Sequence, residues 1–213
     1  MKRQAYRLSP QQRRVWSLLQ AQQQRSPFRV QCVATLRGEI DTATLKSAIA
    51  SVVKRHDVLR ATFVTTDAEP VQIINDNAEF CFEEHDFSAP NPEALEFDLE
   101  HGPTLHVWFA RSSTQEYKLI VALPALCADA VTLQNLIAEI ALAYEAAEIG
   151  DESLQYVMTA QWLNDLLEAE ETSAGREYWH KQSSPAPVSL SMERPLRVKK
   201  NPRDSEPESW GLK

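Results

Sequence analysis

The chain has 213 residues, 43% of them hydrophobic and 24% charged, which is typical of a globular protein with a sizeable buried core. Its formal net charge of -8 argues against general nucleic-acid binding, because proteins of that class carry a basic patch. No apolar run is long enough to cross a bilayer, and the polar residues 1–7 are not followed by the apolar segment of a signal peptide.

The first predicted helix begins after Ser9, which can cap it. Pro10 suits the first turn, and Gln12 stands where a capping box requires Glu or Gln. Apolar and polar side chains then alternate over residues 28–37, with Val33 as the only exception, and this period of two predicts a half-buried strand.

A second helix is predicted after Asp41, which can cap its first turn. Its apolar residues follow helical spacing: Leu45, Ala48, Ile49, Val52 and Val53. Strands are predicted over residues 59–65 and 70–74, with a weaker one over residues 80–84.

A hairpin is predicted over residues 105–123, with its turn near Ser113. Its second arm, residues 119–123, is apolar throughout, as expected of a central strand covered on both faces. The order of elements predicts an α/β (α+β) fold in which helices flank a mixed β-sheet.

The last predicted elements are helical. A third helix begins near Asp129 and can end at Gly150, and a fourth helical region spans residues 154–182 with a break around residues 172–175. Residues 183–213 hold five of the twelve prolines and predict a linker or extended tail. The chain is thus predicted to form one domain over residues 1–182, followed by this tail.

Four segments, in this order along the chain, resemble motifs of nonribosomal peptide synthetase condensation domains. They are LSPQQRRVW at residues 8–16, RHDVLRATF at 55–63, FDL followed by GP at 97–103, and the pair Tyr178 and Trp179. The resemblance implies one lobe of a chloramphenicol acetyltransferase-like fold, with the second lobe missing from this chain. It also implies substrates that a carrier protein holds on phosphopantetheine and that meet in a tunnel between two lobes, with no cofactor bound directly.

The catalytic motif of this family reads His-His-x-x-x-Asp-Gly, and the matching segment here reads Pro-Ala-Leu-Cys-Ala-Asp-Ala. Pro124 stands at the first histidine, and Ala125 stands at the second, which is the catalytic one. Because alanine has no titratable group, it cannot act as a general base. The resemblance implies that the remaining Asp129 pairs with Arg60. Alternatively, Asp129 caps the third helix, and both roles can hold together.

Two further sets of residues have candidate roles. Cys127 lies in the same segment, where it is either a reactive thiol or, on the ordinary interpretation, a small buried hydrophobe. The spacing of His85, His101 and His106 matches no zinc pattern, so no metal site is predicted. The three cysteines are odd in number and far apart, which favours free thiols and a cytoplasmic location.

These observations predict a non-catalytic, truncated condensation-like domain. It would dock or scaffold a carrier protein or an adjacent synthetase domain in secondary metabolite biosynthesis, without activity of its own. The alternative is half of an enzyme that forms amide bonds between carrier-bound acyl groups once it is joined to a second lobe. An uncovered lobe face could also drive self-association, and neither nucleic acid nor membrane is an expected partner.

Overall fold

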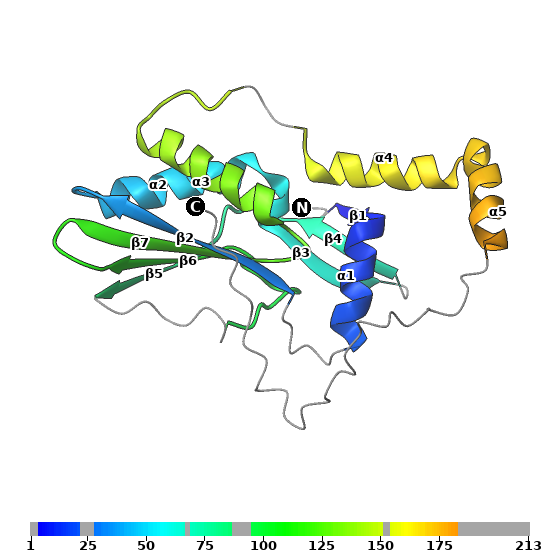
Figure 1. Cartoon of the computed structure of the whole chain (residues 1–213), viewed down its shortest axis with the longest axis horizontal. Coiled ribbons are helices and arrows are strands. Elements are labelled where there is room, and N and C mark those ends of the chain that lie inside the picture. The colour runs from blue at the N-terminus through cyan, green and yellow to red at the C-terminus, as the bar shows by residue number, and fades with distance from the viewer. Residues whose placement is uncertain (1–3, 22–27, 67–68, 87–94, 151–153, 183–213) are drawn as a thin grey trace, which may run out of the picture. The chain divides into compact units, whose positions relative to one another are not determined.

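The computed structural model describes residues 4–21, 28–66, 69–86, 95–150 and 154–182 (Figure 1). The chain divides into two compact units, Met1–Glu170 and Glu171–Lys213. The predicted tail, residues 183–213, lies outside the described residues, so its boundary at residue 182 stays a prediction. No helix of the described residues is long and apolar enough to cross a membrane.

The start of the first unit confirms the predicted capping box. Strand β1 (Ala5–Arg7) precedes helix α1 (Pro10–Ala21). The backbone N–H of Ser9 donates to Oε1 of Gln12 over 3.0 Å, and the backbone N–H of Gln12 donates to Oγ of Ser9 over 3.1 Å. This reciprocal pair satisfies two backbone donors that the first turn of a helix leaves without partners.

A four-stranded mixed sheet forms the larger layer of this unit, in the order β2-β7-β6-β5. Its strands are β2 (Arg29–Arg37), β5 (Cys81–Asp86), β6 (His106–Arg111) and β7 (Glu116–Pro124). Strand β7 is antiparallel to β2 and to β6, whereas β5 runs parallel to β6. The sheet therefore confirms the predicted hairpin, the strand over residues 28–37 and the weaker strand near residue 80.

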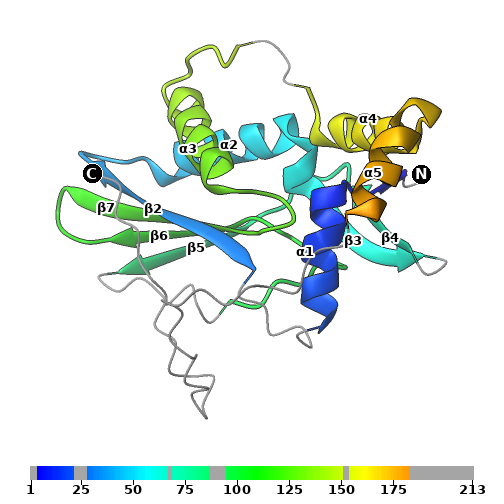
Figure 2. The same ribbon diagram turned by 45° about the vertical axis from the view of Figure 1, so that its right-hand side comes forward.

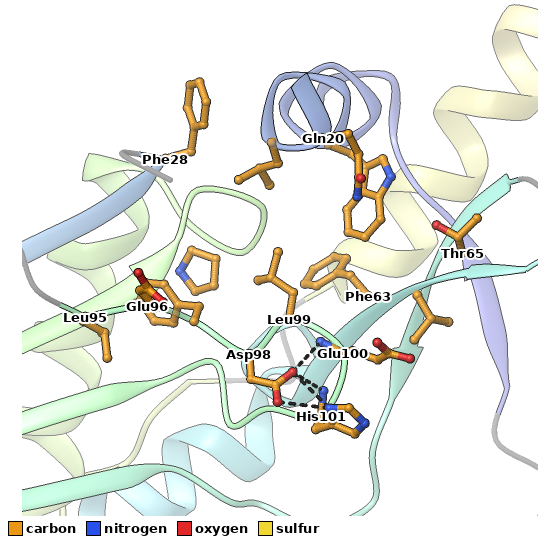
Figure 3. A pocket seen from close by; sticks show the side chains of 15 residues that line it. Gln20, Phe28, Phe63, Thr65, Leu95, Glu96, Asp98, Leu99, Glu100 and His101 are labelled. Carbon is orange, nitrogen blue, oxygen red and sulfur yellow. Dashed lines mark hydrogen bonds and ion pairs between the residues drawn. The ribbon is translucent and has the colours of Figure 1, made fainter. Parts of the chain in front are cut away.

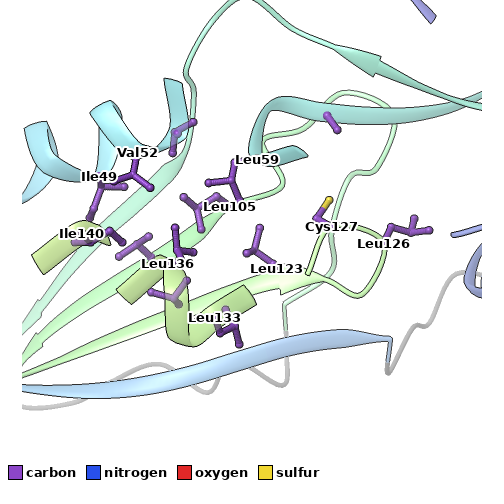
Figure 4. Packing of buried hydrophobic residues seen from close by; sticks show 14 of the residues in the cluster. Ile49, Val52, Leu59, Leu105, Leu123, Leu126, Cys127, Leu133, Leu136 and Ile140 are labelled. Carbon is purple, nitrogen blue, oxygen red and sulfur yellow. The ribbon is translucent and has the colours of Figure 1, made fainter. Parts of the chain in front are cut away.

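Helices α2 (Thr42–Arg55) and α3 (Ala130–Tyr144) lie side by side over one face of this sheet (Figures 1 and 2). Asp41 caps α2 as predicted, because its carboxylate accepts the backbone N–H of Thr44 over 2.6 Å. Ile49 from α2 and Ile140 from α3 pack with Leu123 of β7 in the main hydrophobic core (Figure 4).

The other face of β7 is covered as well. Ile120 and Ala122 of β7 form a second apolar cluster with Trp108 of β6, and Leu95 and Phe97 pack against it. All residues from Leu119 to Leu123 are therefore buried, at most 4% exposed. This confirms the prediction of a central strand that is covered on both faces.

A second, three-stranded sheet has the order β1-β4-β3, with β3 at Ala61–Thr66 and β4 at Glu69–Ile74. The sequence predicted that the first of these strands begins at residue 59. It begins two residues later, because Asp57–Arg60 form the short 3-10 helix η1.

Helix α3 ends earlier than predicted, at Tyr144 and not at Gly150. Ala146 adopts a left-handed conformation with φ of 53°. The N–H of Ala146 donates to the carbonyl of Ala143 over 3.2 Å, and the N–H of Ala147 donates to the carbonyl of Leu142 over 2.9 Å. These two bonds form a Schellman motif, which terminates the helix with alanine in the position that glycine usually holds.

The last helical region is broken, as predicted, but the break comes earlier. Helix α4 (Tyr156–Glu168) ends before the 3-10 helix η3 (Glu170–Thr172), and α5 (Ser173–Lys181) follows in sequence.

Ala146→Gly is expected to stabilise the protein, because the left-handed conformation costs alanine about 1–2 kcal/mol and glycine tolerates it. Glycine also raises the conformational entropy of the unfolded chain, which offsets part of this gain. The net increase in the free energy of unfolding should therefore be about 0.5–1 kcal/mol. Ala138→Gly, at an exposed position inside α3, is the matched control and should lower the same quantity by about 1 kcal/mol. Urea denaturation followed by circular dichroism measures both, and a loss of stability in both variants would contradict the assignment.

Candidate functional site

The segment that the sequence analysis aligned with a catalytic motif connects β7 to α3. We call residues 124–130 the motif loop. The N–H of Ala125 donates to the carbonyl of Phe28 over 2.9 Å, and the N–H of Cys127 donates to the carbonyl of Pro124 over 2.9 Å. The side chains of Leu126 and Cys127 are buried and belong to the main core (Figure 4). The motif loop is thus an anchored turn of the core.

A buried glutamine joins the motif loop to two other elements. Gln12 is 3% exposed, and its Nε2 donates to the carbonyl of Leu126 over 3.0 Å. The side-chain amides of Gln12 and Gln72, on β4, also lie 3.4 Å apart. The sequence indicated the capping role of Gln12 but not its contacts with Leu126 and Gln72. Those two residues lie far from Gln12 in the sequence, so no local pattern predicts the contacts.

Asp129 caps α3, as one of the two interpretations predicted. Its carboxylate accepts the backbone N–H of Thr132 over 2.8 Å and the hydroxyl of Thr132 over 2.7 Å. These hydrogen bonds, with the backbone bond as the larger cause, hold the pKa of Asp129 below its ordinary value. The carboxylate is therefore ionised at neutral pH and engaged at the helix N-terminus.

The expected ion pair between Arg60 and Asp129 is not formed among the residues that the structure describes. The guanidinium of Arg60 instead pairs with the carboxylate of Asp57 over 2.6 Å and donates to the carbonyl of Asn75. The physical reason is local competition: Asp57 lies in the same 3-10 helix as Arg60, three residues earlier, while Asp129 is engaged by Thr132.

Cys127 has the properties of a structural thiol. It is buried, and burial raises the pKa of its thiol to about 12, although a hydrogen bond with the side chain of Thr104 opposes the shift. A reactive cysteine needs an accessible, electropositive setting that lowers its pKa. The surroundings of Cys127 therefore favour the interpretation as a small buried hydrophobe.

Two pockets flank the motif loop. The larger, which we call the aromatic pocket, has a volume of about 580 Å³. The smaller, which we call the loop pocket, has a volume of about 380 Å³. Pro124 lines the aromatic pocket, whereas Ala125 lines the loop pocket. A side chain at position 125 would therefore border the loop pocket.

One imidazole lines the loop pocket. His56, at the end of α2, lies with its Nε2 2.6 Å from Oε2 of Glu139 on α3. Both side chains are about one quarter exposed, at 24% and 23%. Nothing in the spacing of residues 56 and 139 along the chain predicts that these two side chains meet.

The three histidines considered for metal binding have other partners. His85 lies 3.3 Å from Glu83, His101 lies 3.0 Å from Asp98, and the ring of His106 packs against the rings of Phe97 and Trp108. Among the described ranges, no three His, Cys, Asp or Glu side chains are grouped so that they could hold a metal ion.

Comparison with known proteins places the chain in a family. The sequence profile of the Condensation domain family matches residues 2–206. The chain is 28% identical over 186 residues to surfactin synthase subunit 2 of Bacillus subtilis (strain 168), covering 84% of this chain and 5% of that protein. It is 27% identical over 183 residues to bacitracin synthase 2 of Bacillus licheniformis, covering 82% of this chain and 7% of that protein. The chain belongs to the condensation domain family.

Solved structures show the same fold. The starter condensation domain of rhizomide synthetase matches with a TM-score of 0.75 at 15% identity, over 86% of this chain and 49% of that chain. The X-domain in a complex with OxyB from teicoplanin biosynthesis matches with a TM-score of 0.73 at 22% identity, over 92% of this chain and 48% of that chain. The protein therefore has the condensation-domain fold, related to chloramphenicol acetyltransferase, and spans about half the length of these chains.

A double-mutant cycle tests the partners of Arg60. Arg60→Ala combined with Asp57→Ala should give a coupling energy of about 1 kcal/mol, because the two side chains form a half-buried ion pair. The control cycle pairs Arg60→Ala with Asp129→Asn, which retains a capping side chain, and should give less than about 0.3 kcal/mol. Larger coupling with Asp129 than with Asp57, measured by urea unfolding, would restore the ion pair implied by the family resemblance.

Alkylation tests the state of Cys127. At pH 8 its thiol is protonated in the folded protein, because that pH lies far below a pKa of about 12. Iodoacetamide should therefore modify the partly exposed Cys81 before Cys127, and mass spectrometry of tryptic peptides gives the order. In urea both should react. Faster modification of Cys127 in the folded protein would show that it is an activated thiol.

Proposed function

We propose that this chain is a non-catalytic condensation-domain lobe that docks a carrier protein or a neighbouring domain within a peptide synthetase. The observation that carries the proposal is the chemistry of the motif loop. Pro124 and Ala125 stand where the family motif has its two histidines, and neither side chain can accept a proton.

The other polar groups of the motif loop already have structural roles, which supports the proposal. Asp129 caps α3, the carbonyl of Leu126 accepts from Gln12, and the Cys127 thiol is buried with a raised pKa. The loop thus retains its shape without a group that could activate the amine of an incoming aminoacyl chain. Removing a general base costs about 10²–10⁴-fold in rate.

A docking role agrees with one structural relative, the X-domain, whose structure is a complex with another protein, OxyB. This likeness is one of fold at 22% identity, so it supports docking as a use of the fold and does not name a partner. The synthetases that the chain resembles in sequence make carrier and adjacent domains the partners to test first.

One observation favours the alternative, an acyltransferase that works with a second lobe. His56 lines the loop pocket together with Ala125, and the carboxylate of Glu139 lies beside its ring. An imidazole held by a carboxylate is the arrangement that orients a general base. If the chain forms amide bonds, His56→Gln should abolish the activity.

The decisive experiment separates binding from catalysis. The full chain is titrated with the carrier domains of its own synthetase by calorimetry, and the same mixtures, with acyl groups loaded, are analysed for amide products by mass spectrometry. We expect binding in the micromolar range, typical of transient contacts, and no product. The Pro124→His, Ala125→His double variant shows whether restoring the motif restores chemistry.

Product formation by the unaltered chain would contradict the non-catalytic assignment, and its loss in His56→Gln would identify the alternative. Failure to bind any carrier or neighbouring domain would contradict the docking role, whatever the outcome of the activity assay.

A further inference from the structure

The aromatic pocket has aromatic and aliphatic side chains in its walls beside polar ones, and it is partly open to water. Its lining residues come from α1, from β3, from residues 95–101, from the end of β7 and from the residue just before β2, among them Trp16, Phe28, Phe63, Phe97 and Leu99. Phe63 is buried, but Trp16, Phe28, Phe97 and Leu99 are half-buried. Because apolar area facing water is stabilised when a ligand covers it, these walls suit an apolar group.

The rim of this pocket is acidic. Along residues 95–100 half-buried apolar side chains alternate with exposed carboxylates, which are Glu96, Asp98 and Glu100. Among the described residues that line the pocket there is no Lys or Arg, and His101 is paired with Asp98 over 3.0 Å. The pocket therefore presents negative charge around an apolar centre.

Figure 3 shows how these charges are arranged. Glu96 and Glu100 lie toward opposite sides of the pocket, with Leu99 and Asp98 between them and with Phe28 and Gln20 across from them. Asp98 already accepts the backbone N–H groups of Glu100 and His101, over 3.1 and 2.9 Å. The side-chain carboxylates of Glu96 and Glu100 form no hydrogen bond or ion pair with another described residue, so their charges remain available to a ligand.

We propose that the aromatic pocket binds a segment of a partner protein that inserts one apolar side chain between two basic residues. This inference rests on the proposed docking function and specifies the chemistry of the partner. The apolar side chain covers Trp16, Phe28 and Leu99, and the two basic residues reach Glu96 and Glu100. Complementary charge of this kind sets specificity and association rate at an interface.

The arrangement disfavours two other occupants. A small organic amine carries one positive charge and meets one of the two separated carboxylates. The phosphopantetheine arm of a carrier protein carries a phosphodiester, whose negative charge is repelled by an acidic rim. A polypeptide with basic residues on both sides of an apolar one meets both carboxylates and the apolar wall together.

The test uses the full chain and fluorescently labelled peptides. The probe has a Leu-Trp-Leu centre with two lysines on each side, and two matched peptides carry glutamates in place of the lysines or Ser-Gly-Ser in place of the centre. Fluorescence anisotropy should give the tightest binding for the lysine probe, with each matched peptide at least about ten-fold weaker. Raising the salt concentration should weaken the lysine probe, because exposed charges are screened.

Two charge variants locate the site. Glu96→Gln with Glu100→Gln should weaken the lysine probe by about ten-fold, since each exposed ion pair contributes modestly. Glu145→Gln with Glu148→Gln removes the same charge from exposed positions outside the pocket and is the control. It should leave the affinity unchanged.

Four results would overturn the proposal: equal binding of the lysine and glutamate peptides, equal loss in the two charge variants, tryptamine binding as tightly as the lysine probe, or no binding at all. Tight tryptamine binding would instead assign the pocket to a small aromatic amine. The carrier titration described above is independent of these peptides. Failure of the peptide proposal alone therefore leaves the docking function standing, and failure of the titration alone leaves the pocket's specificity standing.

Discussion

Burial of β7 is the constraint on which the rest of this unit depends. The strand is paired along both edges, with β2 and with β6, and apolar side chains cover both of its faces. A strand in this position cannot shift in register without moving apolar side chains to the wrong face. The position of Pro124 at its end, and therefore of the motif loop, follows from that pairing.

Hydrogen bonds from several elements hold the motif loop in place. Its backbone is held by Phe28 and Gln12, and its aspartate begins α3. These contacts use hydrogen-bonding groups that an alanine or a histidine at position 125 would leave in place. The interactions that fold the loop are therefore independent of the side chain at position 125.

The two pockets beside this loop differ in their chemistry, and that difference gives them different uses. The loop pocket is lined by Ala125 and by His56, whose imidazole lies beside the carboxylate of Glu139. The aromatic pocket combines half-buried rings with carboxylates at its rim, which is a combination that selects a partner by charge and by an apolar anchor. Membership of the condensation domain family does not by itself say what either pocket binds, because one fold supports several functions.

The sequence by itself determined the elements whose cause is local. The capping box at Ser9 and Gln12, the cap at Asp41 and the apolar run at residues 119–123 were all predicted, because neighbouring residues satisfy or bury one another there. Only the tertiary structure decided the choices between competing partners. Arg60 pairs with Asp57, Gln12 reaches Leu126, and α3 ends at the left-handed Ala146. The bridge from Gln12 depends on the distance between elements far apart in the sequence, and the end of α3 depends on a left-handed backbone conformation that glycine, not alanine, usually marks. The partner of Arg60 was decided by the 3-10 helix that brings Asp57 close and by the capping role that engages Asp129.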